Sequence, residues 1–246
     1  MWLNYTQTIY CGEKPLMYSG DRLVILDADG TTIDAFTAIR SAFAVHGMNL
    51  GDLERFQRRR NPFKYLGGFR DFSGNLRNHI SRTRRNKIID TLTEVYRFEG
   101  TLYPGIANLM NRLITLADCR VGVLTRNITW EPEETLKQLY ARQGVEVAAL
   151  DFLTHIPLKQ QKAPYFRSIR DQYLVNPARS YSCGDEQIDF LAAQSTGTHP
   201  FMAAYGFEGY WRLIYKSKVP KELISQDSQE LCARMLNALG LNGEGG

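Results

Sequence analysis

The chain has 246 residues, 43% of them hydrophobic and 23% charged, with a net charge of +4 at pH 7. These values are ordinary for a globular protein with one large domain, or with a core domain and a smaller insertion. No apolar run approaches the length of a membrane span, so we expect no membrane partner. The start of the chain has neither the basic residues nor the apolar stretch of a signal peptide. Four widely spaced cysteines without a CxxC pair argue against a disulfide framework or a zinc site and favour a cytoplasmic protein.

The first predicted strand is the apolar run Leu23–Leu26, which leads directly into Asp27, Ala28, Asp29 and Gly30. Open α/β sheets bind their ligands at the carboxyl ends of strands, where these acids stand. Residues i and i+2 of a strand point the same way, so both carboxylates are able to face one point. Two carboxylates held close together need a cation between them or a shared proton. This segment alone leaves a plain solvated turn open as an alternative.

A helical insertion is predicted after the acidic pair. The next clear strand begins roughly ninety residues later, and amphipathic helices are predicted at 36–47 and 85–97. Between Arg55 and Lys87 there are eleven Lys and Arg against one acid, Asp71, so this segment carries +10 and the rest of the chain carries −6. We therefore predict a basic helical cap over residues 35–102, with the chain returning to the core at Tyr103-Pro104-Gly105.

The remaining pattern alternates strands with helices. Strands are predicted at 121–125, 180–184 and 201–204, with a short one inside 145–153, and helices at 106–116, 133–143, 164–173 and 188–194. Asp227-x-x-Glu230 resembles a capping box that opens a helix running through Leu239. The predicted fold class is α/β, a Rossmann-like parallel sheet with helices on both faces and a small α-helical cap. The predicted parts are an N-terminal extension (1–20), the core (21–34 and 103–240), the cap (35–102) and a disordered tail (241–246).

Four motifs follow one another in the chain. They are DxDGT at Asp27–Thr31, a strand-end hydroxyl at Thr125, a loop lysine at Lys162, and GDxxxD at Gly184–Asp189. Lys159 competes with Lys162, but the proline two residues after Lys162 favours the latter. In this order and strand context the motifs resemble the haloacid dehalogenase superfamily, in the branch with phosphoglycolate phosphatase-like members. The resemblance covers residues 22 to about 214.

The resemblance implies phosphoryl transfer with a defined set of roles. Asp27 is expected to be the nucleophile that forms an aspartyl-phosphate, and Asp29 the general acid and base. Thr125 is expected to hydrogen-bond a phosphoryl oxygen, and Lys162 to neutralise it and hold Asp27. Mg²⁺ is the implied cofactor, with three expected ligands and two further acids that orient its waters, one of which is a candidate direct ligand. The ligands are the carboxylates of Asp27 and Asp185 and the backbone carbonyl of Asp29; the further acids are Glu186 and Asp189.

The substrate-binding predictions are less specific. Gly30, inside the first motif, is one candidate, and Arg126 and Asn127, which follow the second, are two more. Many relatives have Thr-Asn at the second motif, where this chain has Thr125-Arg126-Asn127. Arg126 either adds a phosphate contact or points elsewhere. The cap contributes four more candidates able to reach an acidic substrate, namely Arg59, Arg60, Lys64 and Arg70.

Three functions are compatible with these residues. The favoured one is a Mg²⁺-dependent phosphatase acting on a small phosphorylated metabolite, because dehalogenases of the superfamily lack an equivalent of Asp29 and displaced halide needs no proton. A phosphomutase of the same family is hardly distinguishable from it. Basic and aromatic residues in the cap leave a nucleic-acid-binding protein as the third possibility. The sequence does not identify the substrate or the oligomeric state.

Overall fold

A computed structural model of the chain describes residues 17–54, 57 and 82–241. Most of the predicted N-terminal extension, the predicted tail beyond residue 241, and most of the basic segment between the two cap helices lie outside these residues. None of the helices in the described ranges is long and apolar enough to cross a membrane.

The core is a six-stranded sheet in which all neighbouring strands are parallel. The strand order β3-β2-β1-β4-β5-β6 places β1 in the middle, and the chain changes direction across the sheet between β1 and β4. Such a switch point is where open α/β sheets bind ligands. The strands are β1 (Arg22–Leu26), β2 (Cys119–Thr125), β3 (Phe152–His155), β4 (Ser180–Gly184), β5 (His199–Ala203) and β6 (Ile224–Ser225).

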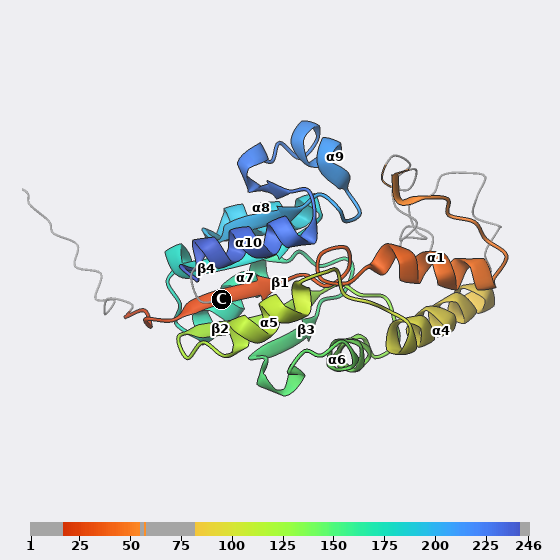
Figure 1. Ribbon diagram of the computed structural model, residues 1–246, viewed down its shortest axis with the longest axis horizontal. Coiled ribbons are helices and arrows are strands. Elements are labelled where there is room, and N and C mark those ends of the chain that lie inside the picture. The colour runs from red at the N-terminus through yellow and green to blue at the C-terminus, as the bar shows by residue number, and fades with distance from the viewer. Residues whose placement is uncertain (1–16, 55–56, 58–81, 242–246) are drawn as a thin grey trace, which may run out of the picture.

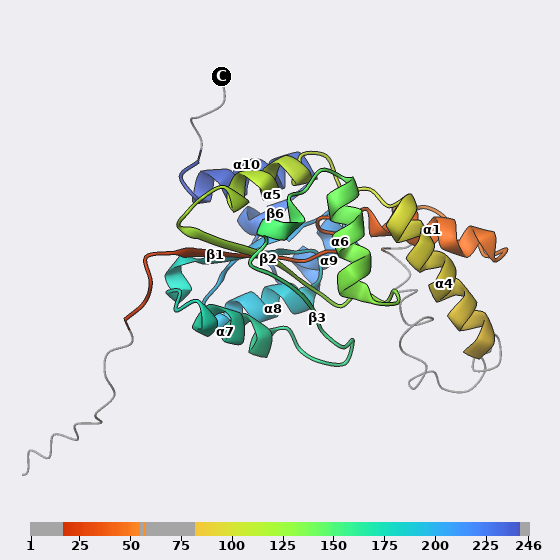
Figure 2. The ribbon, with the colours of Figure 1, turned by 90° about the horizontal axis from the view of Figure 1, so that it is seen from below.

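Helices cover both faces of the sheet, as predicted for this fold class. α5 and α10 lie on one face and α7 and α8 on the other (Figure 2). The helices are α1 (Ala35–Val45), α4 (Arg82–Phe98), α5 (Ile106–Ile114), α6 (Pro132–Arg142), α7 (Ala163–Gln172), α8 (Gln187–Thr196), α9 (Gly209–Tyr215) and α10 (Ser228–Ala238), with short 3₁₀ turns at Val147–Ala149, Pro177–Arg179 and Lys221–Leu223.

The apolar run of β1 supplies both halves of the core. Val24 and Leu26 belong to the cluster formed with α5, α6 and α10, whereas Leu23 and Ile25 belong to the cluster formed with α7 and α8. Alternate side chains of a strand point to opposite faces, so a strand covered on both sides must be apolar throughout. This continuous burial fixes the position of the chain where β1 ends, and the acids follow immediately.

The helices α1 and α4 of the predicted cap lie side by side at one end of the molecule (Figures 1 and 2). Asp34 caps α1, its carboxylate accepting from the Thr37 backbone N–H at 3.1 Å. The outgoing and returning chains pair, since the Asp34 N–H donates to the Thr101 carbonyl at 2.9 Å and the Tyr103 N–H to the Thr32 carbonyl at 3.0 Å. The segment therefore leaves and rejoins the core at a single place beside the acidic pair.

The capping box predicted before the last helix forms only in part. Asp227 accepts from the Glu230 N–H at 2.8 Å, but the Glu230 carboxylate accepts from the Gln226 N–H at 2.7 Å instead of from that of Asp227.

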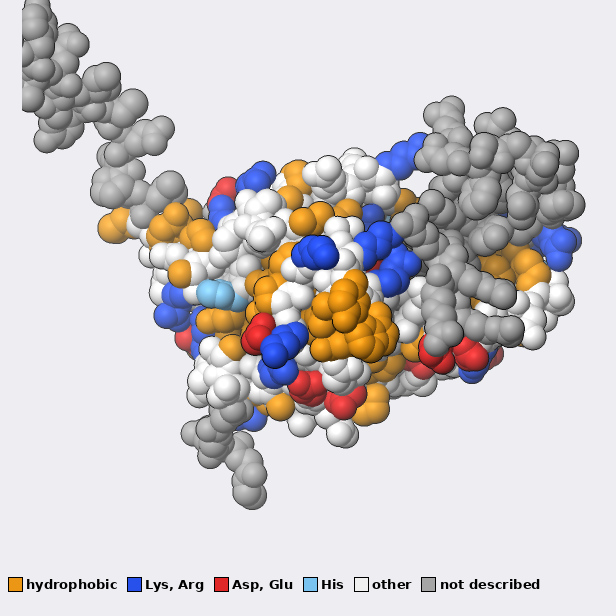
Figure 3. All heavy atoms as spheres, turned by 90° about the horizontal axis from the view of Figure 1, so that it is seen from above, with side chains coloured by type: hydrophobic (Ala, Val, Ile, Leu, Met, Phe, Trp, Pro, Cys, Tyr) orange, Lys and Arg blue, Asp and Glu red, His pale blue; other side chains and the backbone are white. Residues whose placement is uncertain are grey.

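Two elements were not predicted, the two-residue strand β6 and the helix α9. Figure 3 shows hydrophobic side chains gathered on the face of the molecule that carries α9, with Lys and Arg side chains around them. Trp211 and Tyr215 of this helix are 67% and 63% exposed and stack with ring centroids 5.4 Å apart.

Candidate active site

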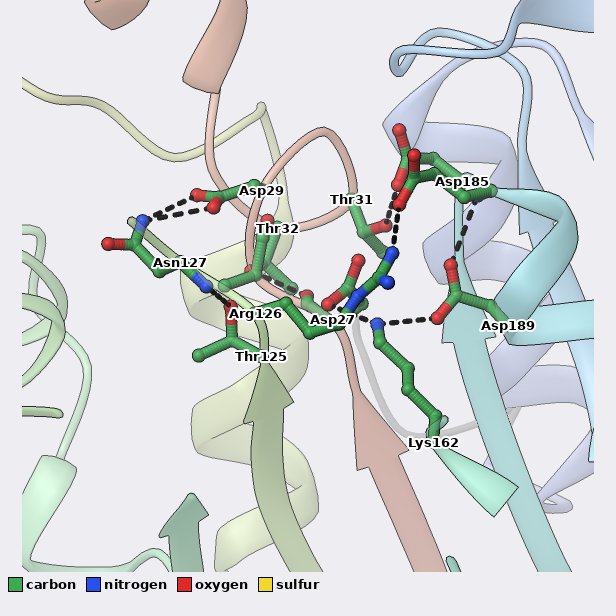
Figure 4. A network of polar contacts seen from close by, with 12 residues as sticks. Asp27, Asp29, Thr31, Thr32, Thr125, Arg126, Asn127, Lys162, Asp185 and Asp189 are labelled. Carbon is green, nitrogen blue, oxygen red and sulfur yellow. Dashed lines mark hydrogen bonds and ion pairs between the residues drawn. The ribbon is translucent and has the colours of Figure 1, made fainter. Parts of the chain in front are cut away.

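Asp27 stands at the end of β1, and its carboxylate is held by a buried lysine. Lys162 Nζ lies 2.6 Å from Asp27 Oδ1 and 2.5 Å from Asp189 Oδ1, and the lysine side chain is only 2% exposed (Figure 4). Lys159, the competing lysine, is exposed. Burial raises the pKa of Asp27 to about 7, against the opposing effect of Lys162. Burial alone would lower the pKa of Lys162, but the two carboxylates outweigh it and raise that pKa.

Asp185 follows β4 and is completely buried. It accepts from the Phe207 backbone N–H at 2.6 Å and from Thr31 Oγ1 at 3.4 Å. In the described ranges no lysine, arginine or histidine forms an ion pair with it. Burial, followed by repulsion from Glu186 and Asp27, holds the pKa of Asp185 well above its usual range. A buried carboxylate without a cationic partner is costly, so this position calls for a cation.

Three carboxylates converge where that cation is needed. One oxygen from each of Asp27, Asp185 and Asp189 lies within 4.8 Å of the other two. Three acids and one lysine leave the cluster negative, and hard oxygen donors of this kind suit Mg²⁺ or Ca²⁺. The residues therefore fit a divalent metal ion. Of the two further acids, one of which was a candidate direct ligand, Asp189 is itself part of the cluster. Glu186 forms an ion pair with Arg126 instead.

The Asp29 side chain points away from this cluster of carboxylates (Figure 4). Its carboxylate accepts from Asn127 Nδ2, which lies 3.0 and 2.9 Å from the two oxygens, and from the Tyr96 hydroxyl at 2.7 Å. Figure 4 shows it turned toward Asn127 and away from Lys162 and Asp189. The two acids of the motif therefore do not converge on one point through their side chains. Burial raises the pKa of Asp29, while the hydrogen bonds from Tyr96 and Asn127 oppose the rise.

The side chains of the residues that follow β2 point in different directions. Thr125 is buried at the end of the strand, and its hydroxyl accepts from the Asn127 N–H at 3.2 Å. Arg126 forms an ion pair with Glu186 at 2.8 Å, so its side chain points across the site toward the chain that follows β4. Asn127 contacts Asp29 as described above. Arg126 thus reaches Glu186, beside the cluster of carboxylates, whereas Asn127 reaches Asp29 on the other side of the site.

Close packing around Asp185 explains the glycine of the first motif. Gly30 has φ +79°, a conformation that favours glycine. A Cβ atom there would lie 2.3 Å from Asp185 Oδ2, and one at Gly206 would lie 2.4 Å from the same oxygen. Gly30 therefore lets the loop after β1 approach Asp185.

No protein-family model and no curated protein matches the sequence. Solved structures do match over nearly their whole length. A haloacid dehalogenase-like hydrolase from Streptococcus pneumoniae aligns with a TM-score of 0.61 and 17% identity, covering 88% of this chain and 99% of the other. A predicted phosphoglycolate phosphatase from Haemophilus somnus aligns with a TM-score of 0.62 and 16% identity, covering 90% and 99%. The fold is that of the haloacid dehalogenase-like hydrolases.

A third structure with this haloacid dehalogenase-like fold bears on the choice between reactions. A protein assigned as a beta-phosphoglucomutase from Thermotoga maritima aligns with a TM-score of 0.59 and 14% identity, covering 88% of this chain and 99% of the other. The same fold therefore occurs in proteins assigned to hydrolysis and to phosphoryl rearrangement, so the fold alone does not separate them.

The sequence analysis missed two contributors to this site. Tyr96 reaches Asp29 from α4, but in the sequence it reads only as part of an apolar helix face. The Phe207 N–H reaches Asp185 from the chain between β5 and α9, and a backbone donor leaves no trace in residue types. The predicted cap residues Arg59, Arg60, Lys64 and Arg70 lie outside the described residues.

Proposed function

We propose that the protein is a Mg²⁺-dependent phosphatase that hydrolyses a small phosphorylated metabolite through an aspartyl-phosphate on Asp27. One observation carries the proposal: a buried Asp27 carboxylate, held by Lys162, lies beside Asp185 at the switch point of the sheet. Displacement at phosphorus needs a nucleophile, compensation of the charge on the phosphoryl oxygens and a proton for the leaving group. We assign these three tasks to Asp27, Lys162 and Asp29, respectively.

In the first step, an Asp27 oxygen attacks phosphorus while the bond from phosphorus to the leaving oxygen breaks. Asp29 gives its proton to that oxygen, which departs as an alcohol. Burial favours this role, because it raises the pKa of Asp29 and so favours the protonated acid. Thr125 donates to a phosphoryl oxygen, and Lys162 offsets the charge while it fixes Asp27.

In the second step, water attacks phosphorus and Asp29 takes the proton of that water. The bond between phosphorus and the Asp27 oxygen breaks, which releases inorganic phosphate and restores both acids to their starting states. Asp29 thus serves as acid and then as base, and no other proton carrier is needed.

Asp27, Asp185 and Asp189, together with the Asp29 backbone carbonyl, are the residues that would hold Mg²⁺. When bound, the ion supplies positive charge that shields the carboxylate nucleophile from the phosphate dianion. Asp185 has the strongest need for it, since it lacks a cationic partner in the described part of the chain.

The proposed substrate class is the small phosphate monoesters, and the cap at residues 35–102 is the part that recognises the leaving group. The cytoplasmic location inferred from the cysteines stays a prediction. A phosphomutase would use the same Asp27 chemistry but would protect the aspartyl-phosphate from water. Rapid loss of phosphate from the phosphorylated enzyme favours the phosphatase over this alternative.

The test is phosphate release from p-nitrophenyl phosphate with Mg²⁺, for the wild type and for Asp27→Asn. The variant keeps the size of the side chain but removes the charge that attacks phosphorus, so we expect at least a thousandfold loss. Asp171→Asn is the matched control, because Asp171 is an exposed acid of α7. Equal rates for the wild type and Asp27→Asn would end the proposal.

A further inference from the structure

The Asp29 carboxylate is held by donors from two parts of the chain that are distant in sequence. Tyr96 comes from α4 and donates its hydroxyl at 2.7 Å, and Asn127 follows β2 and reaches both oxygens at 3.0 and 2.9 Å. Both donors are uncharged groups. Burial and the neighbouring Asp29 hold the pKa of Tyr96 well above its usual range, so the phenol keeps the proton that it donates.

Tyr96 is itself fixed. Its side chain is 1% exposed and belongs to the main hydrophobic cluster. A buried ring with this much contact has few alternative rotamers. Its hydroxyl direction is therefore set by the packing of α4 rather than by Asp29.

The half of α4 that carries Tyr96 is tied to the segment after β2. The Trp130 N–H donates to Thr93 Oγ1 at 3.0 Å, and Trp130 Nε1 donates to Asp90 Oδ1 at 2.6 Å. Arg97, next to Tyr96, donates to Thr135 Oγ1 at 3.2 Å. These bonds join α4 to the same stretch of chain that carries Asn127. Tyr96 and Asn127 therefore belong to connected segments, and together they fix the position of the Asp29 carboxylate.

We infer that Tyr96 is a positioning residue for Asp29, holding the carboxyl group in the direction from which it protonates the leaving oxygen. The inference rests on the proposed function, in which Asp29 is the acid. A general acid must lie within hydrogen-bond reach of the atom it protonates, and small misplacements cost large factors in rate. Removal of the Tyr96 hydroxyl leaves Asp29 with the Asn127 amide as its remaining side-chain donor in the described structure.

The experiment uses two aryl phosphates whose leaving groups differ in basicity and therefore in how much they need the acid. p-Nitrophenyl phosphate releases a weakly basic phenolate that needs little protonation, whereas phenyl phosphate releases a more basic one. The kcat/KM value reports the steps up to phosphoryl transfer to Asp27. For Tyr96→Phe we expect kcat/KM to fall about 10- to 100-fold with phenyl phosphate and less than about threefold with p-nitrophenyl phosphate.

Two further variants separate positioning from loss of structure. Tyr140→Phe is the matched control, because it removes an equally buried hydroxyl that bonds Thr32 at 2.6 Å and has no hydrogen bond to Asp29 among the described contacts. We expect it to change both substrates by similar, small factors. In the background of Asp29→Asn, Tyr96→Phe should cause no further loss, because the acid it positions is gone.

Equal losses with both substrates, or a full additional loss in the Asp29→Asn background, would overturn the role of Tyr96 while leaving the phosphatase intact. Failure of the proposed function has a different signature. In that case Asp29→Asn would leave phenyl phosphate turnover unchanged, or Asp27→Asn would stay active, and both conclusions would fall.

Discussion

Replacement of Lys162 by methionine tests whether the buried ion cluster is arranged as described. Lys162 is 2% exposed and lies 2.6 Å from Asp27 and 2.5 Å from Asp189, so the change leaves two buried carboxylates without their shared cation. Removing one partner from such a cluster costs about 3–5 kcal/mol of unfolding free energy. For a chain of this size that corresponds to roughly 6–20 °C in Tm.

The assay is urea unfolding in EDTA, followed by circular dichroism, for the wild type, Lys162→Met and Lys159→Met. Lys159 is exposed, so its replacement should change the unfolding free energy by less than about 0.5 kcal/mol. A loss below about 1 kcal/mol in Lys162→Met, or the same loss in both variants, would refute the reasoning.

The effect of Lys162→Met should also depend on pH. Burial already raises the pKa of Asp27 to about 7, and Lys162 is the main group that opposes the rise. Without Lys162 the pKa of Asp27 in the folded protein rises further, so the folded protein binds more protons than the unfolded chain over a wider pH range. The unfolding free energy therefore falls further as pH rises. Between pH 5 and pH 8 the gap between variant and wild type should widen mainly as pH passes about 7, where Asp27 ionises in the wild type but stays protonated in the variant. A gap that stays constant across this range would contradict the assignment.

Three further predictions concern the rest of the site. Asp185→Asn should abolish Mg²⁺-dependent turnover of p-nitrophenyl phosphate yet leave stability in EDTA equal to or above that of the wild type, because it removes a buried acid whose ionised form has no cationic partner in the described part of the chain. Gly30→Ala should lower activity at least tenfold and stability by about 1–3 kcal/mol in urea unfolding, since its Cβ would lie 2.3 Å from Asp185 Oδ2 at a backbone φ of +79°. Arg126→Met should raise KM by less than about threefold in the same assay, because the guanidinium is already held by Glu186.

The sequence predicted the parts of the site that follow strands. Leu23–Leu26 is apolar because β1 is covered on both faces, and that pattern locates Asp27 without further information. Gly184-Asp185 ends β4 in the same way, and the choice of Lys162 over Lys159 agrees with their burial. These residues come together because parallel strands bring their carboxyl ends to one edge of a sheet.

Contacts made between distant segments were not predictable in this way. Tyr96 reaches Asp29 from 67 positions along the chain, through the packing of α4, and no spacing rule encodes that approach. The strand β6 has two residues, too few to show alternation, and α9 has seven, about two turns of helix. Short elements of this kind are specified by the surfaces they cover rather than by their own pattern.

The Asp29 side chain does not follow the alternation of side chains that is typical of a strand. The i, i+2 rule placed both acids on one side, but β1 ends at Leu26, and the chain then turns through Gly30 so that Asp29 bridges to Ile33. The turn gives the two carboxylates different neighbours: Asp27 contacts a lysine, while the described hydrogen-bond donors to Asp29 are the neutral side chains of Tyr96 and Asn127. At Asp27 the cationic Lys162 opposes the effect of burial on the pKa and so favours the ionised form that a nucleophile needs. At Asp29 burial raises the pKa, which favours a proton on the acid, and the neutral donors offset this rise only in part. Two identical residues can therefore perform opposite tasks because the turn between them separates their surroundings.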